Sequence, residues 1–121
     1  MAEGGSGAVT TRFKSDRRMG MSARHLAIIR TLPSCVSGRK PCDAHHLQIP
    51  AERGVGMRAT DRWAVPLTRD EHMDLHQLGS RLEREWFANR GVFDPYGMAR
   101  ELWIATGDPI AMCRVLARFA L

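Results

Sequence analysis

The sequence predicts an α+β fold in which a small two-stranded element precedes several helices. Two short β-like segments, near residues 44–47 and 64–67, occupy the middle of the chain, and helix-capping patterns recur through its second half. The 121 residues fit one small domain with a modest core. A bound metal or a partner would therefore supply part of the stability.

The N-terminal segment, residues 1–20, combines Gly, Ser and Thr with basic side chains and little apolar content. This composition predicts a flexible basic arm. Ser22 then caps a short predicted helix, which ends before Pro33. We expect the arm to be followed by a compact domain over residues 21–106 and by a C-terminal helix over residues 107–121.

The second β-like segment contains Pro66. Proline has no backbone N–H to donate to a sheet, so this strand is expected at an edge or an end.

The helices that follow begin at recognisable caps. Two segments match the capping box and predict helices at about residues 69–78 and 81–90, through the pairs Thr68 with Glu71 and Ser80 with Glu83.

Two further helices are predicted from Asp-Pro pairs, in which the aspartate caps the helix and the proline opens it. The first of them starts at Asp94-Pro95 and ends at Gly107, and the second starts at Asp108-Pro109 and runs to about residue 120. The apolar stripe of the last helix would dock on the domain or pair with a second copy of the chain.

Four of the five histidines form two close pairs, His45-His46 in a β-like segment and His72 with His76 in a helix. Helical residues four apart share a face, so His72 and His76 can hold one ion together. Successive strand residues point to opposite faces, so one member of the His45-His46 pair can add a third ligand. Three imidazoles with an open fourth position are typical of a catalytic metal site. The remaining histidine would then act as a general base.

The segments that carry these histidines resemble a known family. Asp-Ala-His-His-Leu at 43–47, Val-Pro-Leu at 65–67 and the His-x-x-x-His spacing at 72–76 occur in the order seen in HNH (ββα-metal) nucleases. The closest likeness is to small phage and prophage recombination nucleases, with downstream counterparts in Glu85-Trp86-Phe87 and residues 94–103. The resemblance covers about residues 23–104 and implies a small ββα-metal core with flanking helices.

The resemblance also implies roles for the four histidines. His45 would bind the metal from the second strand, and His72 and His76 would complete the site from the helix. His46 would deprotonate the attacking water. One divalent ion would bind, and three imidazoles favour zinc or nickel by affinity, while a nuclease also turns over with magnesium or manganese.

Further roles follow from the same resemblance. Asp43 would orient a histidine from outside the metal's ligand shell, and Arg39 would bind the scissile phosphate. Arginine side chains near the motifs would bind the phosphates of the DNA backbone. The candidates are Arg39, Arg58, Arg62 and Arg69.

The sequence departs from the family pattern at two places. The asparagine of the HNH name falls on Trp63, so Asp61 would have to take its place beside His46. Many relatives also bind a structural zinc through cysteine and histidine, and that zinc is expected to be missing here, since its positions read Ser34, Ser37, Thr68 and Glu71. The three cysteines form no C-x-x-C pair and are expected to be reduced thiols.

The charge balance suits a polyanion partner. The formal net charge is +5, and only Lys14 and Lys40 among the 18 cationic residues are lysines. Arginine binds phosphate bidentately, although a GC-rich genome produces the same excess of arginine over lysine.

The sequence shows no run of about 18 apolar residues and no signal-peptide pattern. It predicts a cytoplasmic protein that does not insert into a membrane.

These observations favour a single-metal endonuclease that hydrolyses DNA phosphodiester bonds with low sequence specificity, in a phage or prophage recombination or processing context. No pattern of a sequence-reading DNA-binding motif is present. The alternative is a non-catalytic nucleic-acid-binding module that keeps the metal as a structural clip. A toxin-like nuclease with an inhibitor partner is a third interpretation. A protein partner or a homodimer fits each of them.

Overall fold

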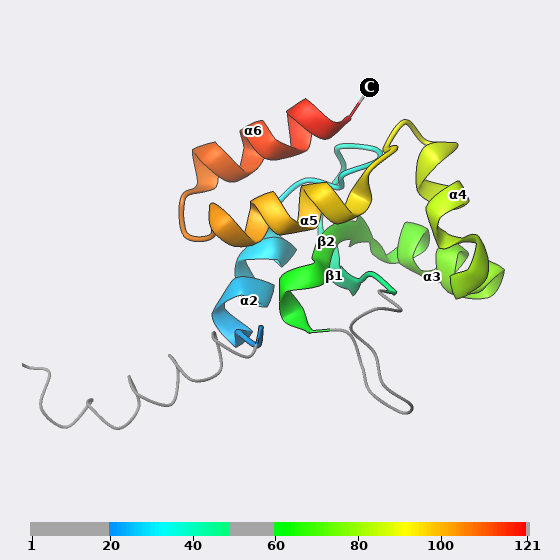
Figure 1. The fold of residues 1–121 in the computed structure, drawn as a ribbon, viewed down its shortest axis with the longest axis horizontal. Coiled ribbons are helices and arrows are strands. Elements are labelled where there is room, and N and C mark those ends of the chain that lie inside the picture. The colour runs from blue at the N-terminus through cyan, green and yellow to red at the C-terminus, as the bar shows by residue number, and fades with distance from the viewer. Residues whose placement is uncertain (1–19, 49–59, 121) are drawn as a thin grey trace, which may run out of the picture.

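The computed structural model describes residues 20–48 and 60–120 (Figure 1). Almost all of the expected basic arm, as well as Arg58, lies outside these described residues. Within them the fold is α+β, as predicted, with a two-stranded antiparallel sheet and five α-helices. In chain order the elements are α2 (Ala23–Thr31), β1 (Cys42–His46), β2 (Ala64–Thr68), α3 (Arg69–Leu78), α4 (Glu83–Ala88), α5 (Pro95–Ile104) and α6 (Pro109–Phe119).

The sheet pairs β1 with β2, and His45 lies opposite Val65 while Ala44 lies opposite Pro66. Both strands of a two-stranded sheet are edge strands, which is the setting that Pro66 requires. The carbonyl of Pro66 accepts a hydrogen bond from the Cys35 backbone N–H at 3.0 Å. The turn that precedes β1 is thereby attached to the side of β2 that faces away from β1.

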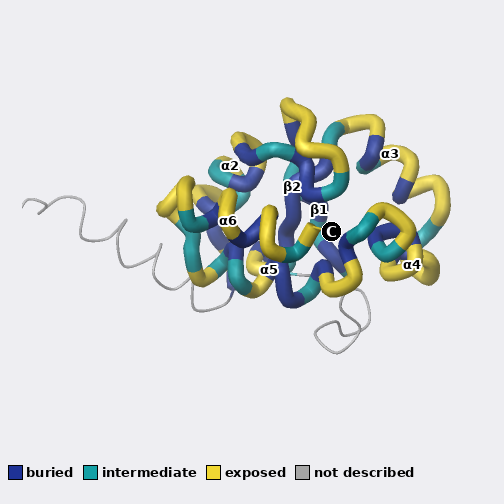
Figure 2. Tube along the Cα trace, turned by 90° about the horizontal axis from the view of Figure 1, so that it is seen from above, coloured by how far each residue is buried: buried dark blue, intermediate teal, exposed yellow. Residues whose placement is uncertain are grey.

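The core lies where the helices meet the sheet. Residues 64–67 of β2 are fully buried, which is the pattern of a strand covered on both faces. Figure 2 shows this strand as buried between helices whose outer surfaces are exposed. Each helix contributes a buried apolar side chain to the same cluster, among them Ile29, Leu75, Phe87, Leu102 and Leu116.

The C-terminal helix α6 docks on the domain, which is one of the two arrangements that its apolar stripe allowed. Its buried residues Met112, Val115 and Leu116 belong to the common core. Asp108 caps it by accepting from the backbone N–H of Ala111. The helix before it, α5, ends at Ile104, three residues earlier than the predicted stop at Gly107.

The helix predicted at 69–78 is confirmed together with its capping box, in which the side chains of Thr68 and Glu71 each bond the other's backbone N–H. The helix predicted at 81–90 is wrong in its bounds and in its cap. Residues 80–82 form a 3-10 turn, and α4 spans only Glu83–Ala88 without a side-chain cap. The Glu83 carboxylate binds partners elsewhere in the fold, so it does not return to the backbone of Ser80.

No helix within residues 20–48 and 60–120 is long and apolar enough to cross a lipid bilayer.

Candidate metal centre

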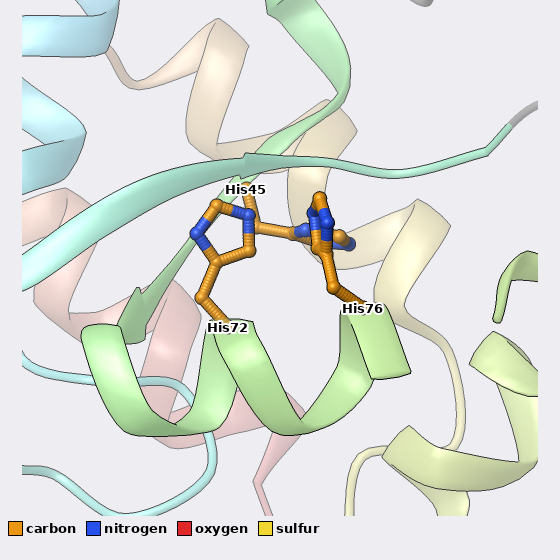
Figure 3. A group of neighbouring side chains, drawn as sticks. All are labelled: His45, His72 and His76. Atoms are coloured by element: carbon orange, nitrogen blue, oxygen red, sulfur yellow. The ribbon is translucent and has the colours of Figure 1, made fainter. Parts of the chain in front are cut away.

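Three histidines converge between β1 and α3. His45 comes from β1, the first strand of the described sheet and not the second as expected, and His72 and His76 come from one face of α3. Helix α3 starts directly after β2, and β2 pairs with β1, so the start of the helix is fixed beside the strand that carries His45. One nitrogen from each ring lies within 4.8 Å of the other two, and Figure 3 shows the three rings turned toward one another.

The three rings form a gradient of burial. His45 is only 3% exposed, His72 is half-buried and His76 is exposed. A small cavity of about 120 Å³ lies beside them, lined by His45, His76 and Glu83 together with Gln48, Leu75, Gly79 and Ser80. A metal ion bound here would contact protein on one side and solvent on the other. This is the arrangement of an open metal site rather than a closed one.

A buried carboxylate sets the protonation of His45. The His45 Nε2 lies 2.7 Å from the Glu83 Oε2, and both side chains are almost fully buried. An ionised carboxylate only accepts hydrogen bonds, so the hydrogen of this contact lies on Nε2, and in the neutral ring the lone pair lies on Nδ1. That Nδ1 is buried and has no hydrogen-bond partner among the described residues.

The same reasoning applies to His72. Its Nδ1 lies 3.1 Å from the Asp43 Oδ2, which leaves the lone pair on Nε2. Each of these two histidines therefore presents one unprotonated nitrogen. Neutral imidazole nitrogens are ligands that zinc, nickel and similar borderline ions prefer. A buried lone pair without a partner is costly, and a cation would remove that cost. The residues thus fit a divalent metal.

Asp43 is itself held by Arg69, one of the arginines expected at the DNA backbone. The Arg69 Nε and Nη2 lie 2.7 and 3.2 Å from the two carboxylate oxygens. These bonds lower the pKa of Asp43; burial opposes the shift, and the contact with His72 adds to it. The predicted orienting role of Asp43 therefore coincides with a contact to a histidine of the cluster, while the Arg69 guanidinium is engaged with the protein itself.

His46 lies outside the cluster of three. It alternates with His45 along β1, so its ring leaves the opposite face of the strand. Its Nε2 lies 2.8 Å from the Asp61 Oδ1, and the other oxygen of Asp61 accepts from the Ser22 backbone N–H at 2.9 Å. Asp61 thus contacts the histidine that the sequence paired it with. This contact puts the Nε2 proton toward Asp61 and the lone pair of His46 on Nδ1.

The two other predicted site residues in the described part of the chain, Arg39 and Arg62, are not members of the histidine cluster. Arg39 lies 3.6 Å from the Glu71 Oε2 and lines a separate hollow with Asp70, Asp74 and Arg90. Arg62 lies in the 3-10 turn at Asp61–Trp63, with its guanidinium 5.8 Å from the centre of the Trp63 ring.

The four positions that the HNH resemblance assigned to a missing structural zinc are brought together as a hydrogen-bonded cluster. The Ser34 hydroxyl donates to the Glu71 Oε1 at 2.6 Å, and the Thr68 N–H donates to the same oxygen at 2.8 Å. Although burial opposes it, hydrogen bonds from Ser34, Ser37 and Thr68 lower the pKa of Glu71. This Glu71 cluster (Ser34, Ser37, Thr68 and Glu71) ties the turn before β1 to the start of α3.

Sequence reasoning missed Glu83 as a partner of the candidate metal centre. The capping-box pattern at residues 80–83 offered a local explanation for this glutamate. Its actual partner, His45, lies 38 residues earlier in the chain. No local signal in the sequence links the two residues.

The fold and the cluster define a small α+β domain with a candidate metal centre built on a strand and the helix that follows the sheet. Residues 11–92, more than half of the chain, match the family described as "Protein of unknown function (DUF968)", and the chain belongs to this family. Comparison with curated proteins and with solved structures gives no match.

Proposed function

We propose that this protein is a single-metal HNH-type endonuclease that hydrolyses DNA phosphodiester bonds. The observation that carries the proposal is the convergence of His45, His72 and His76 on one point at the surface of the domain. When bound there, a divalent ion would polarise a phosphate oxygen and stabilise the leaving oxygen.

The second support is the state of His46. The Asp61 carboxylate lies 2.8 Å from Nε2, so Nδ1 is the nitrogen able to take a proton from water. Asp61 is buried and is anchored by the Ser22 backbone N–H. The His46 side chain is 36% exposed and remains within reach of a substrate. We assign His46 the role of general base, and we propose that Asp61 takes the place of the asparagine found in HNH nucleases.

The substrate class follows from charge and from the resemblance to phage and prophage nucleases. A net charge of +5 favours a polyanion, and we propose DNA, cut with low sequence specificity in the cytoplasm of a bacterial or phage-infected cell. Among the predicted backbone contacts, Arg62 belongs to the same 3-10 turn as Asp61. Arg39 faces the Glu71 cluster, so a contact with the scissile phosphate would require its side chain to turn away from Glu71.

The test is cleavage of plasmid and single-stranded DNA by metal-stripped protein supplied in turn with magnesium, manganese, nickel or zinc. We expect metal-dependent nicking that His46→Ala reduces by roughly 10²- to 10⁴-fold, the usual contribution of a general base. Gln77→Ala, an exposed change on α3 beside His76, is the matched control and should cut like the wild type.

The alternative function is a nucleic-acid-binding module in which the metal is a structural clip. The observation that favours it is the position of His46 on the face of β1 opposite His45. In that case the wild type would bind DNA and metal but cut neither substrate with any of the four ions. His46→Ala would then behave like Gln77→Ala in every assay.

A further inference from the structure

We infer that Glu83 is a positioning residue that selects Nδ1 of His45 as the metal-binding atom; this inference rests on the metal centre of the proposed function. Glu83 is 2% exposed and is the first residue of α4. It reaches the site from a helix that contributes no ligand to the cluster of three histidines.

Both oxygens of Glu83 are used, and each has a different donor. Oε2 accepts from His45 Nε2–H at 2.7 Å, and Oε1 accepts from the Gln48 backbone N–H at 2.8 Å. The Gln48 bond fixes the carboxylate next to the end of β1, so the plane of the carboxylate, and with it the direction of the His45 ring, is set by two anchors. Because Nε2 of His45 is engaged with the Glu83 Oε2, Nδ1 is the ring nitrogen left to bind a metal.

The consequence is seen at the other ring nitrogen. Nδ1 of His45 is buried and has no partner among the described residues, while the rings of His72 and His76 lie 5.1 and 6.2 Å from the His45 ring, centre to centre. A metal-binding histidine commonly donates its second N–H to a carboxylate, which fixes the tautomer and raises the basicity of the ligating nitrogen. Glu83 has the position, burial and partner for this role.

A substitution separates this role from mere filling of space. Glu83→Gln keeps the size of the side chain but replaces one accepting oxygen with a donating NH2 group. The amide can satisfy Gln48 N–H or His45 Nε2–H, but not both. Glu85→Gln is the matched control, because Glu85 lies on the same helix and is exposed.

The first measurement is the protonation of His45 in the metal-free wild type, read from side-chain ¹⁵N shifts by NMR. We expect a proton on Nε2 and none on Nδ1; a proton on Nδ1 overturns the inference without reference to any metal or to cleavage. This measurement needs no variant, so it decides the question even where Glu83→Gln fails to fold.

The second measurement is affinity for zinc and cobalt, with the cobalt absorption spectrum as a report on the ligand set. We expect Glu83→Gln to bind roughly 10- to 100-fold more weakly than the wild type, and Glu85→Gln to bind equally well. Equal affinity of Glu83→Gln and the wild type overturns the role of Glu83. A wild type that has the expected Nε2 proton yet binds neither ion overturns the metal centre itself.

Discussion

Helix α3 carries two polar clusters that differ in whether the protein satisfies them. At its first turn, the Glu71 cluster is closed: the carboxylate accepts from Ser34 and from the Thr68 backbone, and every partner belongs to the chain. On the face that carries His72 and His76, the histidine cluster leaves His45 Nδ1 buried without a partner in the described part of the chain. A closed cluster holds a fold together, whereas an incomplete one is the place where a ligand adds stability.

The largest expected effect comes from removing a ligand of the incomplete cluster. His76→Ala should weaken zinc binding by at least about 100-fold, because loss of even an outer partner of a ligand costs 10- to 100-fold. His76 is exposed, so the fold should persist. Competition titration against a chelating dye measures the affinity, with Gln77→Ala as the control. A His76→Ala protein that binds zinc within threefold of the wild type would break the comparison.

Metal should in turn stabilise the folded state. Zinc at 100 times its dissociation constant is expected to raise the free energy of unfolding by about 2.7 kcal/mol, if the unfolded chain does not bind it. Urea unfolding with and without zinc measures the difference. His76→Ala should lose most of this gain. If zinc does not shift the unfolding midpoint of the wild type, the histidine cluster is as fully satisfied by the protein as the Glu71 cluster.

The Glu71 cluster should respond in the opposite way. Ser34→Ala removes a buried donor to Glu71 and is expected to cost about 1–3 kcal/mol of stability, as for other broken buried hydrogen bonds. Its zinc affinity should be unchanged. Ser80→Ala is the matched control, because Ser80 is exposed and caps no helix, and its cost should stay within about 0.5 kcal/mol. A loss of zinc affinity in Ser34→Ala would mean that the two clusters are coupled.

The smallest effect concerns the thiols near the closed cluster. Burial, with Glu71 and Asp43 adding to it, raises the pKa of Cys42 to about 11, and burial also raises the pKa of Cys35. The thiolate is the form that reacts, so at pH 8 only roughly one Cys42 in a thousand is reactive. Exposed Cys113 should therefore be alkylated first.

The rate at Cys42 should rise about tenfold per pH unit from pH 8 toward 11, since each unit gives ten times more thiolate. Mass spectrometry of iodoacetamide-treated protein reads each cysteine separately. Ser34→Ala should speed the reaction of Cys35 and Cys42 by loosening the turn before β1, and leave Cys113 unaffected. Equal rates at all three cysteines of the wild type would contradict the burial of the first two.

The sequence predicts most of the framework because its signals are local. The capping box at Thr68, the four-residue spacing of His72 and His76, and the proline in β2 each report on a few neighbouring residues, and the structure has them as expected. Two contacts were beyond such signals. Glu83 reaches His45 across 38 residues while matching a local capping pattern, and the direction of Arg39 depends on the fold of a turn that the sequence left undefined.

The contact of Asp61 with His46 is intermediate between the features that local patterns predict and the contacts that they do not. Only its position near the asparagine that the HNH resemblance led us to expect suggested a partnership with His46, and the two side chains do meet at 2.8 Å. The contact depends on the pairing of β1 with β2, since the 3-10 turn that carries Asp61 leads directly into β2. Pairing of two segments that lie far apart is a tertiary property, which residue patterns suggest only where a family likeness supplies the register.

Pro66 has a consequence for how the domain can associate with other chains. Its carbonyl on the outer side of β2 is taken by Cys35 N–H, and its nitrogen has no hydrogen to offer there. A strand from another molecule approaching that side would find neither donor nor acceptor at the centre of β2. Association by strand addition, a frequent route both to peptide recognition and to aggregation, is therefore closed along this edge.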